Sequence, residues 1–141
     1  MPKLFFAFFT LLFGASCQSQ SPLEILKTGF YESSSDSDKM YAALEKSSLS
    51  ISLDVHQGIG VFDQARREWI KLSKIEDLKP YLAKCKNRDF VVISTGMAEW
   101  DKEPEYIKRI AIWCREFGFA AVVVSPNNNQ GLCISEIIPT R

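Results

Sequence analysis

The sequence predicts an α+β fold, a two-layer α/β sandwich in which a mixed sheet of four to five strands carries two helices on one face. Three observations lead to this prediction: residues 49–55 alternate between apolar and polar side chains, residues 90–95 and 120–125 are continuous apolar runs, and residues 75–85 and 107–117 carry apolar stripes at helical spacing. Each predicted helix lies between strands, so the links through the helices are expected to be right-handed crossovers between parallel neighbours. The predicted order is β-β-α-β-α-β-β.

The first 16 residues predict an export signal. Lys3 is followed by the apolar residues 4–13 and then by the small residues 14–16, which is the order found in secretory signal peptides. A helix that crosses a bilayer needs about 20 apolar residues, so this run is too short for a span. Small residues ending at Cys17 also resemble a bacterial lipobox, which implies that Cys17 becomes the lipidated first residue. The alternatives are a simple secretory signal cut nearby and an uncleaved short anchor.

Composition limits the class of partner. Removal of residues 1–16 leaves 125 residues, the size of one domain. The whole chain has 17 basic and 17 acidic side chains, so losing Lys3 leaves 16 basic ones and no strong field that would hold nucleic acid. Cys85, Cys114 and Cys133 are widely spaced and allow at most one disulfide. They lack the spacing of a zinc or redox site, so we expect buried thiols, no metal and no cofactor.

Residues 17–48 are expected to form a tether and a helical segment ahead of the α/β domain at 49–141. Two helices are predicted, near residues 23–27 and 38–46, separated by a serine- and aspartate-rich stretch that favours turns. Asp36 or Ser37 is the expected cap of the second helix. The apolar residues that share one face of that helix are Met40, Ala43 and Leu44.

Residues 49–72 predict a β-hairpin with a possible extension. Strict alternation from Leu49 to Val55 is typical of a strand with one buried and one wet face. The sequence His-Gln-Gly follows as a turn, so residues 51–55 and 59–62 are expected to pair as a hairpin. Residues 68–72 either extend the second strand or add a short third one.

The first predicted helix follows at residue 73. Ser73 and Glu76 have the spacing of a capping box, in which each side chain satisfies a free backbone N–H. Pro80 counts against a regular helix, so we expect either a kink or a late start. The apolar stripe of this helix consists of Ile75, Leu78, Leu82 and Cys85.

Two buried strands and a long helix complete the pattern. Residues 90–95 are apolar on both faces and are expected to form a central strand. Pro104 suits the first turn of the next helix and Gly118 its end. Residues 120–125 predict a second buried strand, followed by a loop and a last strand over residues 132–138.

The order of these elements, together with a set of matching positions, resembles the periplasmic domain of the ExbD/TolR biopolymer-transport proteins over residues 50–126. The matching positions are Ile51, Leu53, Val55, Gly58, Leu72, Leu78, Leu82, Phe90 to Ile93, Tyr106, Ile110, Gly118 and Val122 to Val124. The resemblance implies pairing of the domain with itself, as a homodimer, and contact with an envelope protein or a cell-wall polymer. Members of that family carry a membrane-spanning helix with a proton-moving aspartate, which has no counterpart in the apolar run here, so their motor role is not implied.

The candidate binding site lies in the loop after the predicted central strand. Trp100 follows the carboxyl end of that strand, where open α/β sheets tend to place ligands, and an exposed aromatic there could stack on a sugar or meet a protein. We therefore predict partner or ligand binding by Trp100, Asp101 and Tyr106. The acidic residues Glu99, Asp101, Glu103 and Glu105 are interpreted as favourable charges at a helix start and not as a metal site.

Two functions follow from these observations. The leading hypothesis is a non-catalytic binding or assembly module, lipid-anchored through Cys17 in the bacterial cell envelope and facing the periplasm; without lipidation it would be secreted. The alternative is a small exported enzyme, hydrolase-like, in which His56, the only histidine, works with Asp54 or a nearby acid.

Overall fold

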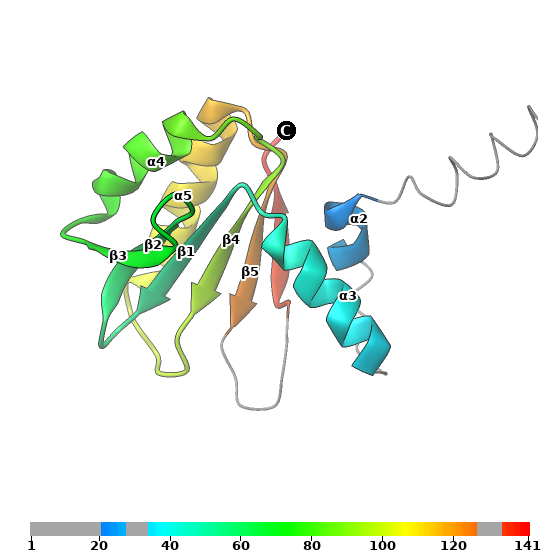
Figure 1. Cartoon of the computed structure of the whole chain (residues 1–141). Coiled ribbons are helices and arrows are strands. Elements are labelled where there is room, and N and C mark those ends of the chain that lie inside the picture. Colours follow the sequence, from blue (N-terminus) through cyan, green and yellow to red (C-terminus); the bar gives the residue numbers. More distant parts are fainter. Residues whose placement is uncertain (1–20, 28–33, 127–133) are drawn as a thin grey trace, which may run out of the picture.

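The structure, a computed structural model, describes residues 21–27, 34–126 and 134–141, which form an α+β unit around one mixed sheet (Figure 1). The predicted class and the mixed sheet are therefore confirmed. The predicted signal peptide, Cys17 and Cys133 lie outside the described residues.

The described sheet has six strands, more than the predicted four to five. Along the chain they are β1 (Leu49–Asp54), β2 (Gly58–Asp63), β3 (Glu68–Leu72), β4 (Phe90–Thr95), β5 (Ala121–Pro126) and β6 (Glu136–Pro139). Across the sheet the order is β3-β2-β1-β4-β5-β6, in which β1, β4 and β5 are parallel and the other neighbouring pairs are antiparallel. Residues 68–72 thus form a strand of their own at one edge of the sheet, and the last strand begins later than predicted.

β1 has one buried and one polar face, as its alternation predicts. The side chains of Ile51 and Leu53 are fully buried, whereas those of Ser50 and Ser52 are only partly buried. The hairpin with β2 is also confirmed, with Ile51 opposite Val61, but β1 ends at Asp54, so Val55 is exposed in the turn and not on the buried face as predicted. The polar face of β1 therefore lies on the side of the sheet that has less cover.

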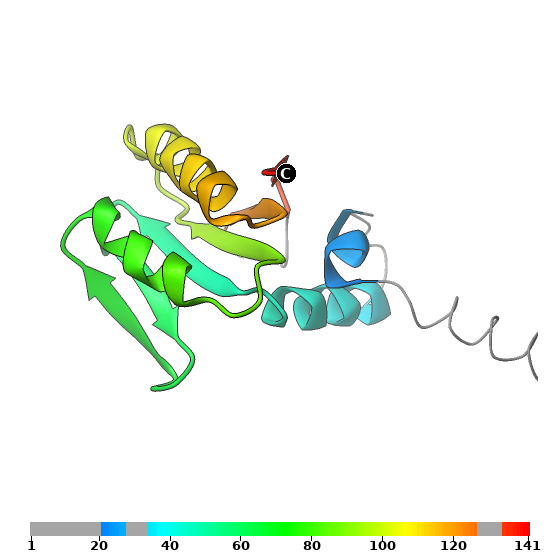
Figure 2. The same cartoon turned by 90° about the horizontal axis from the view of Figure 1, so that it is seen from above.

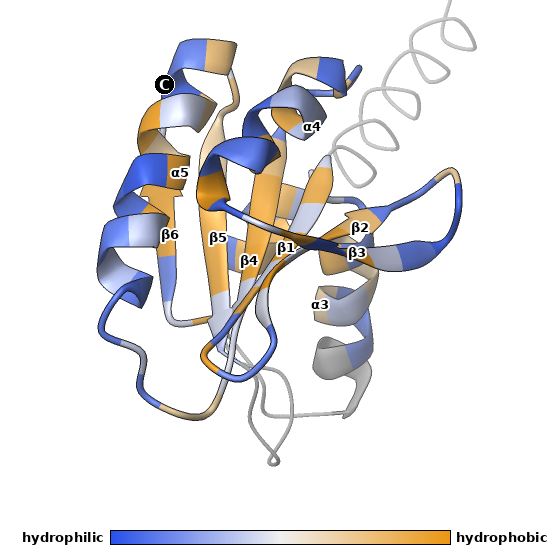
Figure 3. Cartoon of the chain, turned by 90° about the vertical axis from the view of Figure 1, so that its left-hand side faces the viewer, coloured by the Kyte–Doolittle hydropathy of each residue, from blue (hydrophilic) through white to orange (hydrophobic). Residues whose placement is uncertain are grey.

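β4 is the predicted central strand, because it pairs with β1 on one side and with β5 on the other. Phe90 and Val92 contribute to one hydrophobic core, and Val91 and Ile93 contribute to the other. Figure 3 shows that β4 and β5 are hydrophobic along most of their length, as expected of strands whose residues are mostly buried.

The described helical segments are α2 (Pro22–Lys27), α3 (Ser34–Glu45), the 3-10 turn η1 (Ile75–Asp77), α4 (Leu78–Lys84) and α5 (Glu103–Phe117). α4 and α5 pack on the same face of the sheet, over the larger core that contains Leu82 and Ile110. Gly118 ends α5 as predicted, in the left-handed conformation at φ 87°, and the N–H of Phe119 returns to the carbonyl of Cys114 at 2.8 Å. Within the described ranges, no helix combines the length and the apolar character that a membrane crossing requires.

The predicted capping box of Ser73 and Glu76, ahead of α4, is wrong. Lys74 is extended, at φ −150° and ψ 160°, and no side-chain hydrogen bond caps η1 or α4. Glu76 forms an ion pair with Arg109 of α5, so a tertiary partner takes the carboxylate that a capping box with Ser73 would need. Pro80 lies in the first turn of α4, where its missing N–H is not needed, so the late start is correct and the kink is not.

α2 and α3 cover part of the opposite face of the sheet. The prediction placed both helices of the domain on one face and no helix on this one. The two helices lie next to each other and away from α4 and α5 (Figures 1 and 2). Met40 and Ala43 point into a second core, as their shared helical face predicts. α3 begins at Ser34, earlier than predicted, and the side chains of its predicted caps, Asp36 and Ser37, lie outside the described part of the structure. The buried residues of the second core are Leu23, Leu26, Met40, Ala43, Phe90, Val92, Ala121 and Val123.

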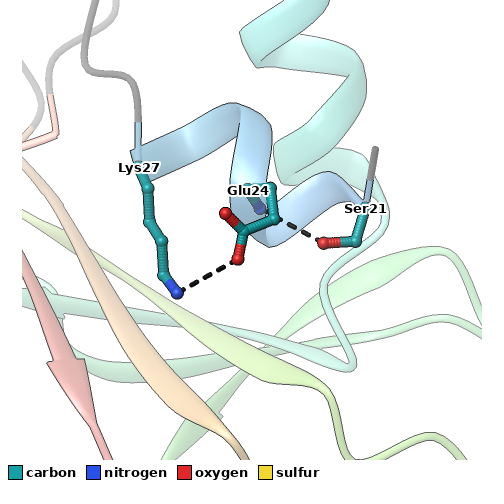
Figure 4. Close-up of polar contacts among 3 residues, drawn as sticks. All are labelled: Ser21, Glu24 and Lys27. Carbon is teal, nitrogen blue, oxygen red and sulfur yellow. Dashed lines mark hydrogen bonds and ion pairs between the residues drawn. The ribbon is translucent and has the colours of Figure 1, made fainter. Parts of the chain in front are cut away.

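A serine cap that the sequence analysis did not use starts α2. The backbone N–H of Glu24 donates to Oγ of Ser21 at 3.3 Å, and Pro22 occupies the first helical position (Figure 4). The carboxylate of Glu24 accepts a bond from Nζ of Lys27 at 3.2 Å, one turn further on. The Ser-x-x-Glu pattern therefore marks the helix start at residues 21–24 and not at residues 73–76.

Candidate functional site

The incompletely covered face of the sheet carries a groove of about 660 Å³, which is within the usual size range of ligand sites. Its floor carries Ser52, Ser94 and Ser125, and its two sides carry Tyr41 of α3 and Trp69 of β3. We call it the serine groove. The groove begins where α3 ends its cover of the sheet. Its position therefore depends on how much of this face the second core occupies.

The three serines lie side by side because they occupy the same register on the three parallel strands. Ser52 pairs with Ser94, and Ser94 pairs with Ser125. Neighbouring strands lie about 4.8 Å apart, so the serine positions repeat at about that spacing. The row continues on β2 with Gly60, which is opposite Ser52 and leaves the floor without a side chain beside Trp69.

Two aromatic side chains form the sides of the serine groove. Tyr41 is 49% exposed and Trp69 is 54% exposed, which is unusual for such large side chains. Trp69 meets Phe62 edge to face, with ring centroids 5.3 Å apart and ring planes at 61°. Cε3 of Trp69 also lies 3.7 Å from the position that a Cβ on Gly60 would occupy. The indole is thus held against the sheet while about half of its surface stays open.

The end of the groove at the carboxyl end of β1 is acidic. Oδ1 of Asp54 accepts hydrogen bonds from the backbone N–H groups of Gln57, at 3.0 Å, and His56, at 2.7 Å. These bonds lower the pKa of Asp54 below its usual range, so its carboxylate is ionised at neutral pH. Among the described residues, the other charged side chain that lines the groove is Glu45.

The loop after β4 passes directly against this carboxylate. The N–H of Gly96 donates to the carbonyl of Leu53 at 2.9 Å, which fixes the loop to the end of β1. A Cβ on Gly96 would lie 2.5 Å from Oδ2 of Asp54, closer than nonbonded atoms can approach. The carboxylate cannot move away without losing its bonds to the turn, so this position requires glycine for space and not for a positive φ.

Replacing Gly96 with alanine should lower the melting temperature by about 3–10 °C, because the added methyl group displaces either the loop or Asp54. Thermal unfolding followed by circular dichroism measures the change. Gly60→Ala is the matched control, since a Cβ there meets its nearest neighbour at 3.6 Å, an ordinary contact. A Gly96→Ala protein as stable as the Gly60→Ala protein would show that the loop does not pack on Asp54.

The predicted binding residues Trp100, Asp101 and Tyr106 do not line the serine groove. The rings of Trp100 and Tyr106 are brought together edge to face, with centroids 5.4 Å apart and planes at 85°. Both rings pack against the larger core, and Asp101 is exposed in the turn before α5. The carbonyl of Trp100 accepts the N–H of Glu103 at 3.0 Å, so this pair braces the loop on α5. A binding role for the three residues stays a prediction.

His56 is exposed at the tip of the β1–β2 hairpin. It lines a second hollow of about 520 Å³ with Trp69 and Lys71, and no carboxylate is among the described residues of that hollow. The carboxylate of Asp54 is bonded to backbone N–H groups of the turn. The hydrolase alternative, in which His56 works with Asp54 or a nearby acid, stays a prediction. In the described part of the chain, Asp54 bonds the backbone N–H of His56 and not its ring.

The acidic residues near the start of α5 have the positions expected of helix-start charges. Glu103 and Glu105 lie in its first turn, where the helix dipole favours negative charge. Burial raises the pKa of Glu103. No group of three or more His, Cys, Asp or Glu side chains within the described ranges is arranged to hold a metal ion.

Two of the cysteines are free thiols, and one of them, Cys114, is buried as expected. Cys85 is half-buried. Burial, with a smaller contribution from the charge of Cys85, raises the pKa of Cys114 to about 12, and burial also raises the pKa of Cys85. Both thiols therefore stay protonated near neutral pH, which is the unreactive form.

The sequence contains an unused signal for the floor of the groove. A serine follows the apolar residues of β4 and of β5, at positions 94 and 125, and Ser52 lies on the polar face of β1. A polar residue at the same position of two otherwise apolar strands is the pattern that could have pointed here. Comparison with protein-family models, with curated proteins and with solved structures finds no match to this chain.

Proposed function

We propose that this chain is a non-catalytic binding module of the bacterial cell envelope, anchored by lipid at Cys17 and facing the periplasm. The serine groove is the observation that carries the binding role. Its floor of hydroxyl groups lies between two half-exposed aromatic rings, Tyr41 and Trp69, and ends at the ionised carboxylate of Asp54. A concave site with apolar sides and a few fixed polar groups is the usual form of a ligand site.

The resemblance of residues 50–126 to the periplasmic domain of the ExbD/TolR proteins supports an envelope role. The resemblance points to an envelope protein or a cell-wall polymer as the partner, and to a homodimer as the assembly. The signal-like residues 1–16 support export, and the cysteine at position 17 supports the anchor.

The anchor is tested by expressing the full chain and its Cys17→Ala variant in a bacterial host. We expect the wild-type chain in the membrane fraction, with an intact mass that shows loss of residues 1–16 and gain of lipid. The Cys17→Ala variant should lose the lipid mass and leave the membrane fraction, because a single export signal without acylation provides no stable anchor. Cys85→Ala is the matched control, and it should keep both properties. Unchanged mass and partitioning of Cys17→Ala would end the lipoprotein proposal.

The binding role is tested by incubating the purified full chain with isolated cell-wall sacculi and, separately, with immobilised envelope proteins. We expect retention on one of the two. A chain that is retained on neither would contradict the proposed function.

A further inference from the structure

We propose that the serine groove binds an uncharged saccharide chain, with a sugar ring lying on Trp69 or Tyr41 and its hydroxyl groups bonded to the floor. This inference rests on the proposed binding function and names the ligand class and the residues that recognise it. The groove differs in place and chemistry from the predicted site at Trp100.

The floor of the serine groove fits a ligand that is rich in hydroxyl groups. Each serine hydroxyl is one donor and two acceptors, so it pairs with a sugar hydroxyl in either direction. Ser52 and Ser94 lie about 4.8 Å apart on neighbouring strands, so a ligand that crosses these strands meets a hydroxyl group on each, while Ser125, the next in the row, is buried. A floor of apolar side chains, such as the buried strands carry elsewhere, would leave sugar hydroxyls unpaired at a cost in free energy.

The sides of the groove fit the apolar face of a sugar ring. The C–H bonds on that face carry partial positive charge, which is attracted to the negative face of an aromatic ring. The edge-to-face contact of Trp69 with Phe62 restricts the indole before a ligand arrives. Little side-chain entropy is therefore lost on binding, which favours affinity.

The charges at the groove disfavour anionic ligands. Asp54 and Glu45 are the charged side chains that line it among the described residues, so phosphate-bearing ligands are repelled. Carboxylates accept hydrogen bonds and do not donate them. A proline-rich peptide also packs on aromatic rings, but its proline residues have no N–H to give to these carboxylates, whereas each sugar hydroxyl has a donor.

The test uses the full chain in a detergent that has no sugar headgroup, titrated with chitotetraose, with cellotetraose and with a decaproline peptide. Calorimetry gives the affinity, and tryptophan fluorescence reports contact with the indole. We expect at least one tetrasaccharide to bind and the peptide not to bind. Trp69→Ala should weaken that binding about tenfold or more, and Trp69→Phe, which keeps a smaller ring, should weaken it less.

The floor is tested by the double variant Ser52→Ala/Ser94→Ala, which removes two hydroxyls without adding bulk and should weaken saccharide binding about tenfold. Ile112→Ala is the matched control, because Ile112 is a 47% exposed apolar residue of α5 and lies outside the groove. Its affinity should equal that of the wild type. Circular dichroism spectra of all the variants show whether each one folds.

Three results would overturn the inference: binding of neither tetrasaccharide at millimolar concentration, saccharide binding that the Trp69 and serine variants leave unchanged, or binding of the peptide alone. The retention assay on sacculi and envelope proteins, run on the same preparation, separates the two proposals. Retention without saccharide binding would contradict the saccharide inference and leave the envelope function standing. Loss of retention on both supports would contradict the proposed function.

Discussion

Replacing Phe90 with alanine should lower the free energy of unfolding by about 3–5 kcal/mol, the usual cost of truncating a fully buried aromatic side chain. Phe90 is 0% exposed and belongs to the second core, on the face of β4 that α2 and α3 cover. Leu26 and Met40, two further fully buried members of that core, come from those helices. The truncation leaves a cavity between the helices and the sheet, because the packed residues around it can relax only in part.

Urea unfolding of the full chain, followed by circular dichroism, measures the loss. Tyr41→Ala is the matched control, since it truncates an aromatic side chain on the exposed side of α3 and should change the free energy of unfolding by about 0.5 kcal/mol or less. A Phe90→Ala protein as stable as the Tyr41→Ala protein would show that α2 and α3 do not cover this face.

The strands were predictable because each one carries its own local pattern. The alternation in β1 identifies a strand with one covered face, and the apolar run of β4 identifies a strand covered on both faces. The parallel pairing of β4 with β5 followed from the helix between them, since a crossover returns the chain in the same direction. The expectation of parallel neighbours was wrong for the link through α4, which joins β3 to β4, because β2 and β1 lie between these two strands in the sheet. None of these inferences needs to know which residues meet across the sheet.

The second core was not predicted, because a weak amphipathic pattern does not say where a helix packs. Met40 and Ala43 identify the buried side of α3, but the face of the sheet that receives them depends on the whole chain path. Phe90 and Val92 were expected to need cover, and the sequence offered no rule that assigns this cover to the N-terminal helices. The serine groove depends on where that cover ends, so it could not be predicted either.

The helix caps were also not predictable from a short sequence pattern alone. Two Ser-x-x-Glu patterns occur, at Ser21 and at Ser73, and both match a capping box, although only the first also has a proline at the first helical position. Ser21 caps its helix, whereas Glu76 of the second pattern binds Arg109 across the larger core face. A competing long-range partner decides between the two, and no short pattern contains that partner.

Arg88 joins the ends of the two helices on the larger core face. Its guanidinium donates to the carbonyl of Ala83 at 2.9 Å, to that of Cys85 at 3.3 Å and to that of Phe117. The last carbonyl groups of a helix have no partner within the helix, and these three lie at or beside the ends of α4 and α5. The guanidinium carbon also lies 5.8 Å from the centroids of the rings of Phe117 and Phe119. The side chain of Arg88 thus donates hydrogen bonds to terminal carbonyl groups of both helices.

Arg88→Ala should lower the free energy of unfolding by about 2–4 kcal/mol, because it removes several charge-assisted hydrogen bonds and leaves partly buried carbonyl groups without a protein donor. Urea unfolding measures the loss. Arg88→Lys should recover only part of it, since a single ammonium group cannot reproduce the planar fork that reaches both helices.

Arg115→Ala is the matched control for this prediction. Arg115 is an exposed arginine in the last turn of α5, where its charge interacts with the helix dipole, so its removal should cost only about 0.3–1 kcal/mol. If Arg88→Lys were as stable as the wild type, charge alone would account for the role of Arg88. If Arg88→Ala cost no more than Arg115→Ala, the two helix ends would be stable without it, and the bonds of the guanidinium would contribute nothing measurable to the fold.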